Sequence, residues 1–366
     1  MIVIAGGGVI GLAIARALAL TGSEVCVLER HGRCGTETST HNSGVIHAGL
    51  YYPAGSLKGR LCVEGREQLY AYCTQENVPH VRCGKLVVAQ ADELSELERV
   101  AGLAKGAGAT IELVDQAFVA VREPYVRAAA ALWSPDTGWL EAEALVRALQ
   151  ADVERHDGHV LVGSPLVAVE PAPAGLIVVT PQERIEAELL INAAGLYVDD
   201  VSRLAGGDDL RIYPCRGEYA TLTAGASALV RGLVYPVPHA SGHGLGTHFT
   251  RTIGGEVWLG PTVHYVDDKQ DYERDRAPVE SFLEPARALV PDITLADLRL
   301  GGTGIRPKLH PASERFADFL IRRDSRNPYV IHAAGIESPG LTACLAVGEM
   351  VAGLAGDGLR SAVCGE

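Results

Sequence analysis

IVIAGGGVIG, residues 2–11, is the stretch that decides the fold of this chain. Its apolar start at 2–5 predicts a short buried strand, and the apolar periodicity of 12–22 predicts a helix packed against that strand. A second apolar strand at 25–28 follows and ends at Glu29. Strand, G-x-G-x-x-G turn, helix, strand and acidic residue in this order predict a Rossmann βαβ unit that binds a dinucleotide.

Each glycine of this unit has a separate physical task. Gly6 permits the tight turn, Gly8 lets the backbone approach a pyrophosphate, and Gly11 lets the helix pack closely on the strand. The helix N-terminus offers free N–H groups and the positive end of its dipole to the phosphates. Glu29 can accept hydrogen bonds from ribose hydroxyls and disfavours a 2′-phosphate, so the pattern favours FAD or NAD over NADP.

Composition narrows the class of protein. The chain has 366 residues, of which 47% are hydrophobic, so it can bury a substantial core in two domains or in one domain with large insertions. A net charge of −13 without a Lys/Arg-rich block argues against a nucleic-acid partner. Eight cysteines without any CxxC spacing predict reduced thiols and no metal site. With neither a signal peptide nor an integral membrane segment recognisable, we expect a cytoplasmic protein.

The segment TSTHNSGVIHAG, residues 38–49, separates the two dinucleotides. It is dense in small hydrogen-bonding side chains, and here the chain resembles the D-amino-acid-oxidase-like superfamily of FAD enzymes. In that superfamily the segment passes beneath the pyrophosphate and reaches the isoalloxazine ring. The resemblance implies FAD as the cofactor, and because the residues around His47 differ from those of relatives with covalent flavin, we expect non-covalent FAD.

The chain is most similar to L-2-hydroxyglutarate dehydrogenases and oxidases within that superfamily. The motifs that carry this resemblance are HNSGVIHAGLYYPAGSLKGRLCVEG (41–65), CGKLVVA (83–89), RGEY (216–219), YPVP (235–238), LGTHFT (245–250) and VWLGPT (257–262). It implies oxidation of a small 2-hydroxy acid, L-2-hydroxyglutarate or a similar dicarboxylate, to the 2-oxo acid by hydride transfer to flavin N5.

Two segments are compatible with substrates other than a 2-hydroxy acid. GIRPKL at 304–309 and GIESPGLTA at 335–343 look more like relatives that act on glycine, sarcosine or glycerol 3-phosphate. The alternatives are therefore an amine or amino-acid oxidase and an enzyme similar to glycerol-3-phosphate dehydrogenases. Two hypotheses assign the chain to another class of protein: a catalytically silent flavin-binding partner subunit and an NAD-dependent dehydrogenase.

The predicted FAD contacts lie at the start, middle and end of the chain. The turn at 336–342 precedes an apolar helix and could cap the O2/N1 edge of the flavin with backbone N–H groups. The predicted cofactor residues are Gly6, Gly8, Val9, Ile10, Gly11, Glu29, Arg30, Ser39, Thr40, Asn42, Ser43, Gly44, Val45, His47, Val167, Ala194, Gly195, Gly304, Ile305, Gly335, Ile336, Glu337, Ser338, Pro339, Gly340, Leu341 and Thr342.

The predicted architecture is α/β, a Rossmann-type FAD-binding domain with an inserted, mainly antiparallel β-sheet substrate domain of α+β character. We assign 1–80, 140–207 and 300–366 to the FAD-binding domain and 81–139 and 208–299 to the substrate domain. Helices are expected at 57–77, 92–107, 141–156 and 277–289. Strands are expected at 85–90, 160–170, 175–180, 187–192, 210–223, 230–237, 246–253, 256–261 and 328–333, with a hairpin turn at 171–174.

Oxidising an α-hydroxy or α-amino acid requires that the substrate carboxylate be held in place. The resemblance places Arg306 at the substrate, and a bidentate guanidinium fits a carboxylate better than an ammonium does. Lys308 could hold a second acidic group of the substrate. Tyr52 and Tyr235 are further candidate substrate contacts.

Removal of the hydroxyl proton requires a base, and a neutral imidazole suits this step. His248 projects from a predicted strand of the substrate domain and faces the pocket if Phe249 faces away. His47 is the second candidate, and His239 and His243 could lie at the entrance. The electron acceptor, whether oxygen, a quinone or a carrier protein, cannot be read from these residues.

Overall fold

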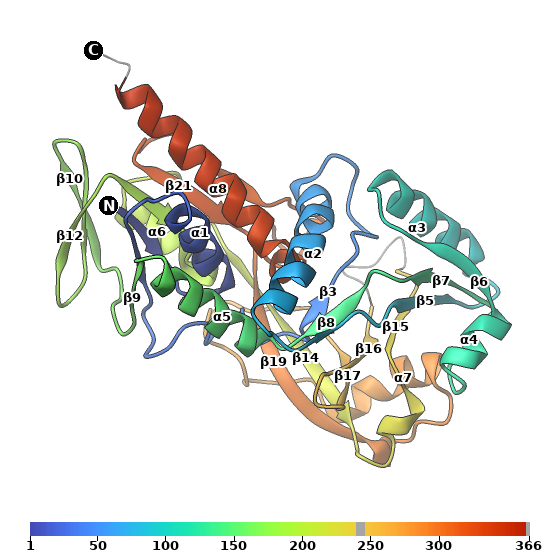
Figure 1. Cartoon of the computed structure of the whole chain (residues 1–366). Coiled ribbons are helices and arrows are strands. Elements are labelled where there is room, and N and C mark those ends of the chain that lie inside the picture. The colour runs from blue at the N-terminus through green and yellow to red at the C-terminus, as the bar shows by residue number, and fades with distance from the viewer. Residues whose placement is uncertain (239–245, 364–366) are drawn as a thin grey trace.

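The computed structural model describes residues 1–238 and 246–363, in which two large β-sheets are surrounded by helices (Figure 1). His239 and His243 lie outside the described residues. No helix in the described part of the chain is long and apolar enough to cross a lipid bilayer.

The first sheet has six strands and contains the N-terminal unit. Its order is β20-β21-β13-β1-β2-β9, made by Leu320–Arg323, Val330–Ala334, Leu189–Asn192, Ile2–Ala5, Val25–Leu28 and His159–Leu161. The strands from β21 to β9 run parallel, and β20 is antiparallel to β21. All residues of β1, β2 and β13 are buried, as their uninterrupted apolar sequences predict for a sheet covered on both faces.

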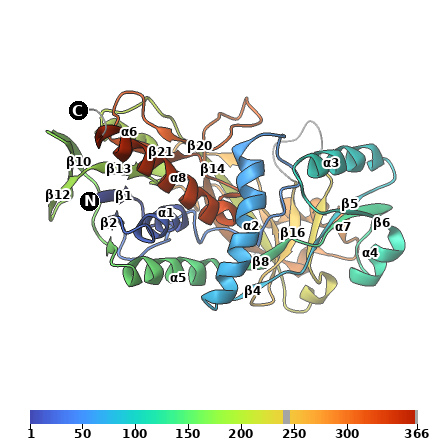
Figure 2. The ribbon, with the colours of Figure 1, turned by 45° about the horizontal axis from the view of Figure 1, so that its top comes forward.

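Helices cover one face of this sheet, and a small sheet covers the other. The helical face carries α1 (Val9–Ala19), α5 (Ala142–Arg155) and α8 (Gly340–Val363), with α2 (Leu57–Gln75) packed against α8 (Figure 2). The opposite face carries α6 (Val198–Leu204) and the three-stranded sheet β10-β11-β12, made by Ala168–Ala172, Gly175–Val179 and Arg184–Ala187.

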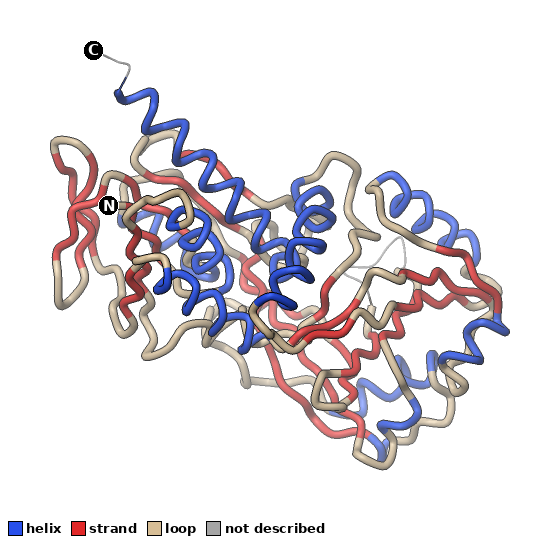
Figure 3. Tube along the Cα trace, in the orientation of Figure 1, coloured by secondary structure: helices blue, strands red, loops and turns tan. Residues whose placement is uncertain are grey.

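The second sheet has nine strands and forms the other half of the molecule, where the strands gather in Figure 3. Its order is β18-β14-β17-β16-β15-β5-β7-β6, with β19 paired to β14. These strands are His264–Tyr265, Tyr213–Leu222, Val257–Gly260, His248–Arg251, Leu233–Pro236, Lys85–Ala89, Ala130–Ser134, Glu112–Asp115 and, for β19, Leu298–Lys308. Every pair is antiparallel except β15 with β5.

Two apolar layers fill the space on the two sides of the nine-stranded sheet. On the outer side it packs against α4 (Gln116–Arg122) and α7 (Leu283–Leu289). On the side of the six-stranded sheet it packs against α3 (Leu94–Gly106) and a small sheet of β3 (Val45–Ile46), β8 (Gly138–Leu140) and β4 (His80–Val81). Single 3₁₀ turns occur at Gly195–Tyr197, Ser227–Leu229, Val279–Phe282 and Leu295–Asp297.

The predicted fold class is confirmed, and most predicted elements lie within a few residues of the observed ones. The prediction of one strand at 160–170 is wrong, because Gly163 adopts a φ of 66° and the chain leaves the sheet between β9 and β10. The hairpin turn at 171–174 is confirmed by the pairing of Ala172 with Gly175. The division into two domains stays a prediction, and its boundary at 300 falls inside the continuous strand β19.

Candidate active site

A cavity of about 1230 Å³ lies between the two large sheets. Residues after the carboxyl ends of β1 and β2 form one part of its wall, and β14, β15, β16 and β19 form another. Crevices at the carboxyl ends of parallel strands are where α/β sheets bind ligands. Ligand pockets typically measure about 300–1,000 Å³, so this cavity has room for a dinucleotide together with a small substrate.

One end of the cavity, called the glycine end here, is formed by residues 6–11 and Glu29. Gly6 has a φ of 113°, and a Cβ there would lie 2.5 Å from the carbonyl oxygen of Ala193. A Cβ on Gly11 would overlap the carbonyl oxygen of Gly6, so only glycine lets α1 approach β1 this closely. Gly8 is the N-cap of α1 and provides no side-chain cap. The N–H of Val9 donates to Oγ of Ser39 at 2.9 Å, and the other backbone N–H groups of the first turn are left for a ligand.

The carboxylate of Glu29 is held by two backbone groups at this end. Its Oε2 accepts a hydrogen bond from the N–H of Gly7 at 2.9 Å, and its Oε1 accepts one from the N–H of His31 at 2.8 Å. Glu29 lines the cavity although it is 7% exposed. This fixed carboxylate can accept hydrogen bonds from vicinal hydroxyls and repels an added phosphate.

The segment between β2 and β3 crosses the middle of the cavity and is tied to the second sheet. Thr38 donates from Oγ1 to the carbonyl oxygen of Ile305 on β19 at 2.9 Å. Asn42 donates to the carbonyl oxygens of Thr38 and Ser39 and accepts from the N–H of Gly44 at 2.8 Å. The small polar side chains seen in the sequence therefore hold this loop in shape and place it along the cavity wall.

Arg306 carries the free positive charge of the opposite wall. A Cβ on Gly217, its near neighbour across the β14–β19 pair, would lie 2.6 Å from Nη2 of Arg306, so the guanidinium lies over this glycine. Nη1 of Arg306 donates to the carbonyl oxygen of Thr262 at 3.2 Å. No carboxylate of the described residues is within ion-pairing distance of Arg306, which leaves the charge for an anionic ligand.

Lys58 and Lys308 share the single carboxylate of Glu337 beside this arginine. Nζ of each lysine lies 3.0 Å from an oxygen of Glu337, and all three residues line the cavity. Burial opposes the charged form of Glu337, but the two ammonium groups outweigh it and lower the pKa of the carboxyl to about 2. We call Lys58, Arg306, Lys308 and Glu337 the cationic end, because their charges sum to +2.

Two histidines, His47 and His248, line the same cavity. Nδ1 of His248 donates to the carbonyl oxygen of Gly246 at 2.7 Å, so Nε2 carries the free lone pair. The ring of His248 stacks on Tyr235 with 3.6 Å between centroids, while Phe249 points into the opposite apolar layer. Nε2 of His47 lies 3.2 Å from Oγ of Ser338, and its N–H donates to Thr342.

Both imidazoles are uncharged near neutral pH. Burial, reinforced by the cation of Lys85 and by His248, lowers the pKa of His47 to about 3. Burial, together with Lys85 and Arg306, also lowers the pKa of His248 to about 3, although the bond to Gly246 opposes this shift. Either imidazole is therefore in the protonation state that a base needs.

Comparison with known proteins identifies the family. Residues 1–354 match the family described as FAD dependent oxidoreductase. The chain is 34% identical to the mitochondrial L-2-hydroxyglutarate dehydrogenase of Arabidopsis thaliana, over 96% of this chain and 82% of that protein. It is 31% identical to the L-2-hydroxyglutarate dehydrogenase of Indibacter alkaliphilus, over 96% of this chain and 97% of that protein. The chain belongs to the FAD-dependent oxidoreductase family.

Solved structures agree on the fold. L-alpha-glycerophosphate oxidase from Mycoplasma pneumoniae with FAD bound has a TM-score of 0.88 at 24% identity, over 97% of this chain and 94% of that chain. Glycine oxidase from Geobacillus kaustophilus has a TM-score of 0.82 at 22% identity, with the same coverage of both chains. At this identity the likeness shows the shared fold and not a shared substrate.

The observed residues fit FAD as the cofactor of this oxidoreductase. The glycine end supplies a backbone cradle that a Cβ would fill, free N–H groups in the first turn of α1 and a fixed carboxylate. The predicted cofactor residues that line the cavity are Gly6, Gly8, Val9, Ile10, Glu29, Arg30, Ser39, Asn42, Ser43, Val45, His47, Ala194, Gly195, Gly304, Ile305, Ile336, Glu337, Ser338, Pro339, Gly340 and Leu341. Of the predicted substrate and catalytic residues, Tyr52, Tyr235, His248, Arg306 and Lys308 line it as well.

Five predicted cofactor residues lie behind the cavity wall, namely Gly11, Thr40, Gly44, Gly335 and Thr342. They shape the wall instead of facing the cavity. Thr40, for example, donates from Oγ1 to the carbonyl oxygen of Gly35 at 2.6 Å, and Thr342 bonds to the backbone of His47. Their roles in binding stay predictions.

Val167 is not among the residues that line the cavity, and its role in binding FAD stays a prediction. Its N–H donates to the carbonyl oxygen of Val179, its side chain is 46% exposed, and its neighbour Leu166 lines the cavity instead. Lys308 lines the cavity, and Glu337 provides it with a carboxylate partner that the sequence did not indicate.

Sequence reasoning missed several residues of the cationic end and its surroundings. Gly217 interrupts a ten-residue strand, and an interior strand glycine is a signal of close approach that could have found it. Tyr219 lines the cavity and hydrogen-bonds to Ser43, but tyrosine is common in strands and gives no such signal. Lys58 and Lys85 are nearly inaccessible to solvent, which neither helix nor strand periodicity indicates for a lysine.

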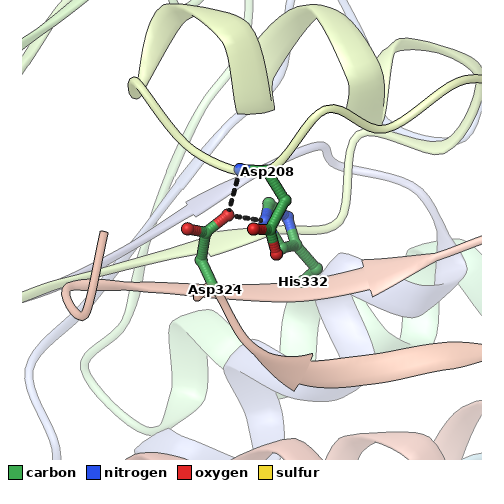
Figure 4. Close-up of side chains that lie close together, drawn as sticks. All are labelled: Asp208, Asp324 and His332. Carbon is green, nitrogen blue, oxygen red and sulfur yellow. Dashed lines mark hydrogen bonds and ion pairs between the residues drawn. The ribbon is translucent and has the colours of Figure 1, made fainter. Parts of the chain in front are cut away.

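Asp208, Asp324 and His332 form a separate polar cluster (Figure 4). Nε2 of His332 lies 2.6 Å from Oδ2 of Asp324, which also accepts from the N–H of Asp208 at 2.6 Å. Nδ1 of His332 lies 3.1 Å from the side-chain nitrogen of Asn192, and Asp208 pairs with Arg322. These bonds account for the cluster as a brace between the loop after α6 and the β20–β21 hairpin.

Proposed function

We propose that this enzyme oxidises L-2-hydroxyglutarate, or a similar 2-hydroxy dicarboxylate, to the 2-oxo acid. The cationic end carries the proposal. Arg306 and the Lys58–Glu337–Lys308 group leave a net charge of +2 on one wall of the cavity, which matches a dianionic substrate. The relatives from Arabidopsis thaliana and Indibacter alkaliphilus, named L-2-hydroxyglutarate dehydrogenases, support the same substrate.

The positions of the two cationic groups fit two carboxylates on a short chain. Arg306 and Lys308 are two residues apart on β19 and project to the same face, about 7 Å apart along an extended strand. The guanidinium of Arg306 can hold one carboxylate through two parallel hydrogen bonds. The second carboxylate of the substrate then lies toward the ammonium groups of Lys58 and Lys308.

The chemistry assigned to the side chains is proton removal and orientation. His248 takes the hydroxyl proton at Nε2, because its Nδ1–H is committed to the carbonyl oxygen of Gly246. As the O–H bond breaks, its electron pair forms the new C=O bond, and the hydrogen at C2 leaves as hydride. FAD, when bound, supplies the hydride acceptor. His47, hydrogen-bonded to Ser338, is the alternative base.

Anaerobic mixing of the purified flavoprotein with candidate substrates tests the proposal. We expect L-2-hydroxyglutarate to bleach the flavin and to yield 2-oxoglutarate, whereas D-2-hydroxyglutarate, glycine, sarcosine and glycerol 3-phosphate leave it oxidised. Bleaching by any of the last three but not by L-2-hydroxyglutarate would overturn the substrate. Bleaching by none of them would favour a catalytically silent flavoprotein.

The electron acceptor and the compartment belong to the proposal as well. Oxygen, a quinone and a carrier protein remain the candidate acceptors, and the rate at which each reoxidises the reduced flavin ranks them. We propose a cytoplasmic, reducing location, since Cys26, Cys34, Cys62, Cys73, Cys83, Cys215 and Cys344 are all free thiols. Cell fractionation with an antibody against this chain tests the location.

A further inference from the structure

Lys85 is a buried lysine without a hydrogen-bond or ion-pair partner among the described residues. It begins β5, is 1% exposed, and its Nζ has no hydrogen-bond partner among the described residues. No carboxylate of those residues pairs with it either. Burying an ammonium without a partner costs several kcal/mol. A residue that destabilises the fold in this way calls for a role in the activity.

Two tyrosine rings separate this ammonium from the cavity. Nζ of Lys85 lies 4.7 Å from the ring centroid of Tyr51 and 4.5 Å from that of Tyr235. Both tyrosines line the cavity, and Tyr235 stacks on the imidazole of His248. Lys85 itself is not part of the cavity wall, so it acts from behind these rings.

We propose that Lys85 is a positioning residue for the oxidation, whose positive charge behind Tyr51 and Tyr235 opposes protonation of the cavity histidines and keeps a base available. This inference rests on the proposed function for the role of the base. The geometry it uses, the ring of Tyr235 between the ammonium of Lys85 and the imidazole of His248, with His47 in the same cavity, does not depend on the substrate.

The other groups around Lys85 in the described part of the chain carry no charge near neutral pH. Burial raises the pKa of the Cys62 thiol, on α2, and of the Cys83 thiol to about 12. Burial likewise raises the pKa of Tyr51 and Tyr235 above the ordinary tyrosine value. Ser134, opposite Lys85 on β7, does not titrate.

Among residues 1–238 and 246–363, the remaining charge that acts on a cavity histidine is Arg306, which lowers the pKa of His248. Lys85 acts on both. It is therefore the cation shared by the two candidate bases.

Lys85 is protonated at a higher pH than the cavity histidines, so its positive charge is present when the pH falls below about 7. Burial lowers the pKa of Lys85 to about 7, and the pKa of each cavity histidine to about 3. As pH falls from 8, Lys85 takes up a proton first, and its cation then resists protonation of His47 and His248. The base therefore stays uncharged between about pH 7 and about pH 4.

Three variants test the role of this charge. Lys85→Met replaces the ammonium with an apolar chain of similar length, Lys85→Arg keeps a permanent charge, and Lys105→Met removes an exposed lysine of α3 as the control. We expect the melting temperature of Lys85→Met to equal or exceed that of the wild type, because an unpaired buried charge is lost. Lys85→Met should therefore fold, and it can be used in the next two measurements.

The first measurement is the rate of anaerobic flavin reduction between pH 3 and 9, a range that includes the acid limb set by the cavity histidines. In Lys85→Met we expect the acid limb to move to higher pH by about one unit or more, since removal of a nearby cation raises the pKa of histidine. Lys85→Arg and Lys105→Met should keep the acid limb of the wild type. A decrease by the same factor at every pH in Lys85→Met would mean a purely structural role and would overturn the proposal.

The second measurement needs no substrate. The side chains of the 12 histidines are titrated by NMR in the flavoprotein, with His47→Gln and His248→Gln used to assign their signals. We expect both signals to stay in the neutral form at pH 5 in the wild type and to titrate at higher pH in Lys85→Met. Unchanged titration would overturn the proposal, while failure of L-2-hydroxyglutarate to bleach the flavin would overturn only the substrate.

Discussion

At the glycine end of the cavity, the groups that face a ligand are backbone N–H groups and one carboxylate, all within the first 30 residues of the chain. At the cationic end they are side chains from α2, β19 and the turn before α8, which lie up to 279 residues apart in sequence. The first end is a local motif, and the second exists only after the two sheets have come together. The difference predicts that variants at one end leave the function of the other intact.

The largest effect is expected for the candidate base. His248→Gln should lower the rate of anaerobic flavin reduction by about 10³-fold, because a general base contributes about 10²–10⁴-fold to such a step. The FAD content of the variant should match that of the wild type. His47→Gln is the matched comparison, and a greater loss in that variant than in His248→Gln would assign the base to His47.

Removal of the free guanidinium should have the next largest effect. Arg306→Ala should lower kcat/KM by about 10²-fold while FAD stays bound, since a charged hydrogen bond to a ligand is worth about 1.5–3 kcal/mol. Arg306→Lys should recover part of this loss, because it restores the charge but not the bidentate geometry. If kcat/KM is unchanged in Arg306→Ala, the arginine does not hold the carboxylate.

A smaller effect should follow from filling the space beneath Arg306. In Gly217→Ala the new Cβ would meet Nη2 of Arg306, so the guanidinium must shift and kcat/KM should fall by about 10-fold. Gly225→Ala is the control, because a Cβ there meets open space. Loss of FAD from Gly217→Ala would show that the two ends are not independent.

The smallest effect is expected at the glycine end. Glu29→Gln removes the charge that we propose binds the ribose of FAD, and the Kd for FAD should rise by about 5–10-fold, or roughly 1–1.4 kcal/mol. With FAD added to saturation, the rate of flavin reduction should equal that of the wild type. A slower rate at saturation would contradict the separation of the two ends.

The same contrast explains what could be predicted from sequence. Gly6, Gly8, Gly11 and Glu29 follow one another along a single βαβ unit, so their spacing alone determines where they meet. The polar loop before His47 could also be predicted, because its side chains form hydrogen bonds with the backbone of residues close in sequence. Local rules were sufficient for both.

The cationic end could be predicted only in part. Arg306 was predicted from a family resemblance. The position of its guanidinium over Gly217 could not be predicted, because it depends on the pairing of β14 with β19, whose two residues lie 89 positions apart in sequence. The ion pair of Lys308 with Glu337 was missed because Glu337 lies in the turn after β21, which is distant in sequence from β19. Lys58 and Lys85 were missed because an apolar pattern does not indicate when an ammonium is buried.

A single-turnover titration tests the central claim, that the cationic end selects a 2-hydroxy dicarboxylate, most directly. The oxidised flavoprotein is titrated without oxygen, once with L-2-hydroxyglutarate and once with L-lactate, a 2-hydroxy monocarboxylate. We predict complete bleaching by L-2-hydroxyglutarate with one 2-oxoglutarate formed per flavin, and no bleaching by equal concentrations of L-lactate. Equal bleaching by the two acids, or bleaching by L-lactate alone, would contradict the account.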